Sequence, residues 1–164
     1  MVTIRKARKS DAKSIVSLWK GFVKHQQGIL ACDKEFVPFA RMKPGTAKHF
    51  ISFARKTIGS RNGVIFLAET NGEEAIGFSL FFIFRIPPQF SPVEKLGCLG
   101  YLFVLGKFRG RGISTKLKDV GFDWLRRKGI RFAMLTVLEK NRMPQAIYRK
   151  WGFTPFAVDM RMKL

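Results

Sequence analysis

Cysteine, acidic side chains and long apolar runs are all scarce in this sequence, and each scarcity excludes a class of protein. The 164 residues include two cysteines, Cys32 and Cys98, too few for a disulfide framework or for paired zinc ligands. The longest apolar run, Ala75 to Phe84, falls short of the ~18 residues that a membrane-spanning helix needs. We therefore expect a reduced, cytoplasmic protein with no metal site and no membrane span.

The start of the chain is basic, and it contains neither an apolar segment nor a small-residue cleavage site, so it does not resemble a secretory signal. Only 11 Asp and Glu stand against 31 Lys and Arg, which leaves a net charge of +20. This excess indicates either a solvated basic surface or an acidic partner such as nucleic acid. Because the basic residues are spread along the whole chain without an arginine-rich tail, we favour the solvated surface.

Hydrophobic periodicity predicts alternating strands and helices in one domain that spans residues 1–164. The order predicts an α/β (α+β) fold, in which a mixed sheet carries helices on both faces. Ser10-Asp11 and Thr46 are the expected helix caps, and Asn71-Gly72 is the expected hairpin turn. Strands are expected at 2–5, 64–69, 75–86, 99–105, 130–138 and 157–164, a loop or broken helix at 28–45, and helices over 11–23, 46–58, 113–127 and 141–150.

The stretch from Gly97 to Ser114 carries the strongest functional signal. An apolar strand is followed at once by a basic glycine loop, and an amphipathic helix follows the loop. Glycines let a backbone approach a ligand closely, and the free N–H groups at a helix start attract anions, so this order favours phosphate binding. The loop lacks the Lys-Ser/Thr pair of a P-loop, and Thr115 stands where a dinucleotide fingerprint has its third glycine.

The segment Arg109-Gly-Arg-Gly-Ile-Ser114 resembles Arg-x-x-Gly-x-Gly/Ala, the pyrophosphate loop of the GCN5-related N-acetyltransferases, although Ser114 departs from the last small residue. A second element, from Asn141 through Tyr148 to Gly152-Phe153, resembles that family's Asn-x-x-Ala-x-x-x-Tyr-x-x-x-Gly-Phe pattern, with Pro144 in place of alanine. The resemblance covers nearly the whole chain. It implies that family's fold, with a mixed, mostly antiparallel sheet and helices on both faces.

The resemblance also implies a coenzyme and a mechanism. Acetyl-CoA would lie where the central strand separates from the next one, and an amine would attack its thioester directly. A strand N–H near Val104 would stabilise the oxyanion, Tyr148 would protonate or hydrogen-bond the leaving thiolate, and Asn141 would touch the pantetheine arm or hold its loop. The implied coenzyme-binding residues are Leu102, Phe103 and Val104 for pantetheine, and Arg109, Gly110, Arg111, Gly112, Ile113 and Ser114 for the pyrophosphate.

The general base is not evident from the sequence. Many members of the family have a carboxylate on the central strand, at positions that are Gly100 and Tyr101 here, and no carboxylate lies between Glu94 and Asp119. Either the amine arrives neutral or a more distant side chain acts through a water molecule. We favour Glu94 among the candidates Glu94, Glu139, Glu35 and His25, and we interpret His25 and His49 as surface histidines and Cys98 as a core residue.

These observations favour an acetyl-CoA-dependent N-acetyltransferase whose acceptor is a primary amine, either a small molecule or a protein N-terminus or lysine. A non-catalytic acyl-CoA-binding regulatory domain is one alternative, since the base is missing. A basic nucleic-acid-binding protein is a less favoured one, because two spaced coenzyme motifs argue against it. The sequence leaves the oligomeric state open, a homodimer included.

Overall fold

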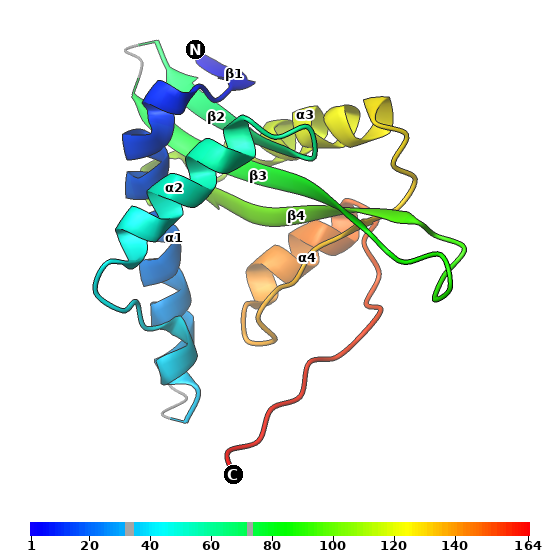
Figure 1. Ribbon diagram of the computed structural model, residues 1–164. Coiled ribbons are helices and arrows are strands. Elements are labelled where there is room, and N and C mark those ends of the chain that lie inside the picture. Colours follow the sequence, from blue (N-terminus) through cyan, green and yellow to red (C-terminus); the bar gives the residue numbers. More distant parts are fainter. Residues whose placement is uncertain (32–34, 72–73) are drawn as a thin grey trace.

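The computed structural model describes residues 1–31, 35–71 and 74–164, which form a mixed five-stranded sheet between helices (Figure 1). The strands lie in the order β1-β2-β3-β4-β5, antiparallel from β1 to β4, with β5 parallel to β4. This arrangement confirms the expected fold class. The strands are β1 (Val2–Lys6), β2 (Gly63–Thr70), β3 (Ala75–Arg85), β4 (Lys95–Val104) and β5 (Ala133–Met134).

Helices cover both faces of the sheet (Figure 1). Leu67 of β2 packs in one apolar cluster with α1 (Ala12–Leu30) and α2 (Thr46–Ile58), whereas Phe66 packs in a second cluster with α3 (Ile113–Arg127). Because successive strand residues point to opposite faces, a strand covered on both sides is apolar throughout. The sheet is therefore a buried middle layer. A fourth helix, α4 (Arg142–Lys150), follows β5.

Two glycines let helices lie close to the sheet. A Cβ atom at Gly121 of α3 would overlap the ring of Phe81 on β3. On the opposite face, a Cβ atom at Gly21 of α1 would lie 3.0 Å from the ring of Phe103 on β4. Each glycine therefore sets the distance between its helix and the central strands.

A charged cluster joins the first strand to its neighbours. The Arg5 guanidinium donates to Asp11 at 2.8 Å and to Glu69 of β2 at 2.6 Å. The hydrogen bond from Arg5 lowers the pKa of Asp11, whose carboxylate also accepts the backbone N–H of Arg8 at 2.6 Å. Asp11 is the N-cap residue of α1, as expected, but its side chain ties β1 to the start of the helix and makes no capping hydrogen bond to α1.

Other local expectations also need correction. The N-cap of α2 is Gly45, with a φ of +83°, and Thr46 instead donates its hydroxyl to the carbonyl of Lys43 at 2.7 Å. α1 continues through Leu30, past the expected start of the loop at residue 28, and a short 3₁₀ turn forms at Val37–Ala40. Cys32 and Gly72, named in the sequence analysis, lie outside the described residues.

The last two expected strands differ most from the structure. The strand expected at 130–138 is reduced to β5, and the strand expected at 157–164 is wrong, since that segment has no secondary structure. Its red trace runs toward the lower end of α1 in Figure 1, and the Arg161 guanidinium lies 4.6 Å from the centre of the Phe39 ring. Alternating apolar residues suit a strand, but a strand also needs a neighbour to satisfy its backbone. The exposed large apolar residues of this segment are Val158, Met160, Met162 and Leu164, and Phe156 just before it is also exposed.

None of the helices within the described ranges is both long enough and apolar enough to cross a membrane. Those same ranges contain no cluster of His, Cys, Asp and Glu able to hold a metal ion. Cys98 is buried in β4, and burial raises the pKa of its thiol to about 11, so it remains protonated at neutral pH. This placement agrees with its interpretation as a core residue.

Candidate functional site

β4 and β5 separate soon after they meet. Their pairing consists of Gly97 with Ala133 and Cys98 with Met134. β4 then continues to Val104 while β5 has already ended. Within the described residues, the edge of β4 beyond Cys98 therefore has no strand beside it. This separation leaves backbone groups available to a ligand.

The β3–β4 register decides which of those groups face the open edge. The Leu105 N–H donates to the carbonyl of Ile76 at 2.9 Å, and Val104 lies opposite Gly77. Because antiparallel pairs alternate between hydrogen-bonded and non-hydrogen-bonded positions, the N–H and C=O groups of Leu102 and Val104 point away from β3. Those of Phe103 point toward β3. Of the three expected pantetheine contacts, two therefore direct their backbone groups to the open edge of β4.

The glycine loop lies directly after this edge. Gly110 and Gly112 have φ values of +76° and +73°, a region that strongly favours glycine, and an added Cβ atom would meet nothing within 4 Å at either position. Gly112 is the N-cap of α3, and the buried side chain of Ile113 anchors the first turn. Free N–H groups at the helix start therefore face open space, beside the exposed side chain of Arg111.

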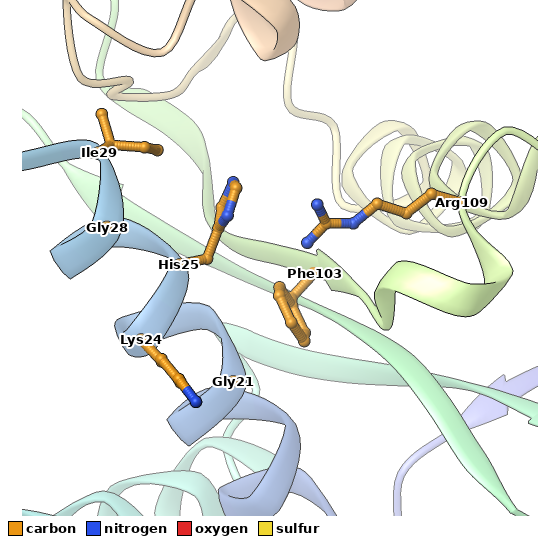
Figure 2. A pocket seen from close by; sticks show the side chains of 7 residues that line it. All are labelled: Gly21, Lys24, His25, Gly28, Ile29, Phe103 and Arg109. Atoms are coloured by element: carbon orange, nitrogen blue, oxygen red, sulfur yellow. The ribbon is translucent and has the colours of Figure 1, made fainter.

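Arg109 turns away from the loop that contains it. Its Nε donates to the Val104 carbonyl at 2.9 Å, and its guanidinium lies 5.5 Å from the centre of the Phe103 ring. Figure 2 shows the guanidinium directed toward His25 on α1. Arg109 therefore links the open edge of β4 to a neighbouring cleft.

This cleft lies between α1 and the end of β4 and has a volume of about 440 Å³. His25 is partly buried in it, and burial, together with the positive charge of Arg109, lowers its pKa below the ordinary value. The imidazole is therefore neutral at pH 7. The cleft is lined by Gly21, Lys24, His25, Gly28, Ile29, Phe103 and Arg109 (Figure 2).

This cleft was not predicted from the sequence, and His25, one of the candidate bases, was interpreted as a surface residue. One signal was present, because Gly21, His25 and Gly28 are spaced by four and three residues and therefore share a helix face. Two glycines beside a histidine leave space that larger side chains would fill. His49, by contrast, is exposed on α2, in agreement with its interpretation as a surface residue.

Tyr148 lies on α4 and is partly buried. Its ring centre is 5.5 Å from that of Trp151 and 6.2 Å from that of Phe153. Burial raises the pKa of the phenol, so the hydroxyl stays protonated at neutral pH. Asn141 is the N-cap of α4, and the amide of Gln145 donates to the Glu139 carbonyl at 2.6 Å, which holds the turn before the helix. The sequence analysis missed Gln145.

Glu94 is not brought near these groups. It is exposed, it precedes the first residue of β4, and its carbonyl accepts the Ile86 N–H at 2.8 Å. Leu102 lies eight positions further along an extended strand, which corresponds to about 25 Å. Glu35 and Glu139 are also exposed.

The structure also explains why no carboxylate stands on the central strand. A Cβ atom at Gly100 would lie 2.8 Å from the Phe82 ring, so that ring occupies the space of a longer side chain. The ring of Tyr101 packs edge-on against those of Phe22 and Phe50, at 5.3 and 5.6 Å between centres. A side chain at Gly100 would therefore displace the Phe82 ring, and a carboxylate in place of Tyr101 would lose this aromatic packing.

Residues 31–153 match the model of the acetyltransferase (GNAT) family. The chain is 27% identical over 154 residues to an uncharacterized N-acetyltransferase, YhfO, of Bacillus subtilis strain 168. The aligned region covers 93% of this chain and 89% of that protein.

Solved structures show the same fold. A predicted acetyltransferase with acetyl-CoA from Clostridium acetobutylicum has a TM-score of 0.77 at 19% identity, over 99% of this chain and 96% of that one. The aminoglycoside N-acetyltransferase AAC(6')-Iy, in complex with CoA, has a TM-score of 0.76 at 19% identity, over 100% of this chain and 95% of that one.

Proposed function

Because the chain belongs to the acetyltransferase (GNAT) family, we propose that it transfers an acetyl group from acetyl-CoA to a primary amine, with a protein N-terminus or lysine as the acceptor. The observation that carries this proposal is the open edge of β4, which leads directly into the glycine loop. This edge offers paired amide groups, and the loop offers anion-binding N–H groups. Acetyl-CoA carries amides and a pyrophosphate in that order.

The residues fit the coenzyme at both ends. The N–H and C=O groups of Leu102 and Val104 point away from β3 and suit the amides of the pantetheine arm. Gly110 and Gly112 leave room for a pyrophosphate at the start of α3, where Arg111 adds positive charge. A carbonyl has two lone pairs, so the Val104 oxygen can keep its bond from Arg109 and accept a pantetheine amide as well.

The edge of β4 and helix α4 contribute to different steps of the proposed reaction. As the amine nitrogen attacks the thioester carbonyl, a free N–H of the β4 edge stabilises the developing oxyanion, since a preorganised donor reorganises little. The Tyr148 hydroxyl then donates a hydrogen bond to the leaving thiolate. Its raised pKa favours this hydrogen bond over complete proton transfer, because an alkyl thiol is already the stronger acid.

The net charge of +20 supports an acceptor in acidic surroundings. Attraction between such an acceptor and the basic surface is screened by salt, whereas the hydrogen bonds that hold the coenzyme at the edge of β4 and the glycine loop are screened less. The acetylation of two peptides, one acidic and one basic around the same amine, tests this idea at low and high salt. We expect a preference for the acidic peptide that shrinks with salt, and equal rates at low salt contradict the acidic acceptor.

A regulatory acyl-CoA-binding domain is the second candidate, and the absence of a carboxylate at Gly100 and Tyr101 favours it. Thiol release from acetyl-CoA in the presence of an amine panel separates the two functions. Binding of acetyl-CoA without amine-dependent thiol release would favour the regulatory domain. Amine-dependent release would establish the enzyme, and Tyr148 supports this outcome because a binding domain needs no stabiliser of a leaving thiolate.

A further inference from the structure

We propose that His25 is the general base of this reaction, taking a proton from the acceptor amine in the cleft between α1 and the end of β4. The inference rests on the proposed acetyl transfer. It answers the question that the central strand leaves open, since Phe82 lies against Gly100 and the ring of Tyr101 packs against Phe22 and Phe50. A lysine-type amine has a pKa of ~10.4 and is therefore protonated at neutral pH, so a base must remove a proton before its nitrogen can attack.

The position of His25 follows from the packing of α1. Gly21 lets that helix lie close to the ring of Phe103, and His25 is one helical turn further along the same face. Gly28 leaves the other side open, because an added Cβ atom there would meet nothing within 4 Å. Figure 2 shows the imidazole reaching into the space above Phe103.

Phe103 also connects the cleft to the reacting groups. Its ring lines the cleft, while its chain neighbours Leu102 and Val104 carry the free backbone groups of the β4 edge. Because the side chain of a strand residue leaves the sheet face, an amine beside this ring lies next to the edge on which we place the thioester. His25 therefore lies on the acceptor side of that edge.

The charges around His25 suit a proton acceptor. Lys24 on the same helix and Arg109 on the loop after β4 line the cleft with it, and no described carboxylate is among the lining residues. Burial and Arg109 lower the pKa of His25, so the imidazole is free to accept a proton near neutral pH. The same positive charges disfavour both a bound ammonium and the imidazolium that forms when His25 takes its proton, so that proton must pass on to water.

The proton balance of the step is simple. Neutral His25 takes one proton from the ammonium, and the freed nitrogen lone pair forms the C–N bond. The C–S bond breaks with its electron pair on sulfur, and the thiolate is stabilised by Tyr148 before water protonates it. The second nitrogen proton leaves as the amide forms, and the imidazolium returns its proton to water. The products are the acetylated amine, the free thiol and one proton.

The test compares His25→Gln with His49→Gln, a matched control on the exposed face of α2. Thiol release by the full chain is measured from pH 5.5 to 9 with a lysine peptide, and acetyl-CoA affinity is measured by calorimetry. We expect His25→Gln to lower kcat by about 10²-fold or more and to flatten the acidic limb of the pH profile, with unchanged coenzyme affinity. The control should match the parent protein.

A second acceptor separates proton transfer from a merely structural role. An amine whose pKa lies well below 7 arrives neutral and needs no base, so His25→Gln should acetylate it at nearly the parent rate. Equal losses with both acceptors, or a lysine-peptide rate within twofold of the parent, would overturn His25 as the base. A parent protein that binds acetyl-CoA but acetylates no amine would instead overturn the proposed function, and the inference with it.

Discussion

Gly112→Asp addresses the proposed phosphate site most directly, because it adds a negative charge while leaving the helix intact. Gly112 is the N-cap of α3, has a φ of +73° and has open space where a Cβ atom would lie. A non-glycine residue in this left-handed region costs about 1–2 kcal/mol. Asp at an N-cap regains about 1 kcal/mol through hydrogen bonding and the helix dipole. The variant should therefore remain folded.

The expected loss of affinity follows from the distance between the charges. Two unit charges about 5 Å apart repel by about 3 kcal/mol at an effective dielectric constant of ~20. A pyrophosphate carries more than one charge, and salt screening acts in the opposite direction. We expect acetyl-CoA to bind about 2–4 kcal/mol more weakly, which is a Kd roughly 30 to 1000 times higher.

Calorimetric titration with acetyl-CoA, alongside a denaturation curve for each variant, provides the measurement. Gly112→Asn has the same size without the charge and should bind more tightly than Gly112→Asp. Gly129→Asp is the second control, because Gly129 has the same φ of +73° and the same open surroundings at the opposite end of α3. Parent-like affinity in folded Gly112→Asp, or an equal loss in Gly129→Asp, refutes phosphate binding at this loop.

Three further predictions concern catalysis and stability. Tyr148→Phe should lower kcat by about 10- to 100-fold, the value of a hydrogen bond to a charged group, while calorimetry shows unchanged coenzyme affinity; an unchanged kcat would contradict its role. Gly121→Ala should lower the free energy of unfolding by about 1–3 kcal/mol, because the added methyl group overpacks against Phe81. Gly28→Ala, at an open helical position, should raise it by about 0.5–1 kcal/mol. Urea denaturation measures both changes. Asp11→Asn should be less stable than the parent protein at pH 7. The lowered pKa of Asp11 means that its ionised form stabilises the fold above pH ~3.9, and this contribution is lost as pH falls through the lowered value, so the difference between the two proteins should disappear in acid. Arg5→Gln should show the same trend.

Local patterns predicted the centre of the fold well. The strand at Ala75–Arg85, the glycine loop and the helix that begins at Ile113 each carry their signal within a few neighbouring residues. The two motifs could also be located in the sequence, through their resemblance to the patterns of the acetyltransferase family. By contrast, the strand expected at 157–164 depends on whether a distant segment offers a free edge, which alternation in the sequence does not reveal.

The candidate base was harder to predict for the same reason. Glu94 lies close to β4 in sequence but about 25 Å from Leu102 along the extended strand. His25 lies far from β4 in sequence, and only the packing of α1 against Phe103 brings it to the cleft. A helix face can be derived from spacing, whereas the partner of that face depends on tertiary packing.

The contact between Gly21 and the Phe103 ring makes one helix position a control on acceptor size. At 3.0 Å from that ring, a new methyl group would act as a wedge and push α1 away from β4. The α1 side of the cleft and the Phe103 ring would then lie further apart, so a bulkier amine would fit while a smaller one would lose its contacts. A substitution at residue 21 would therefore change the acceptors that fit and shift His25 with them, because both residues lie on α1.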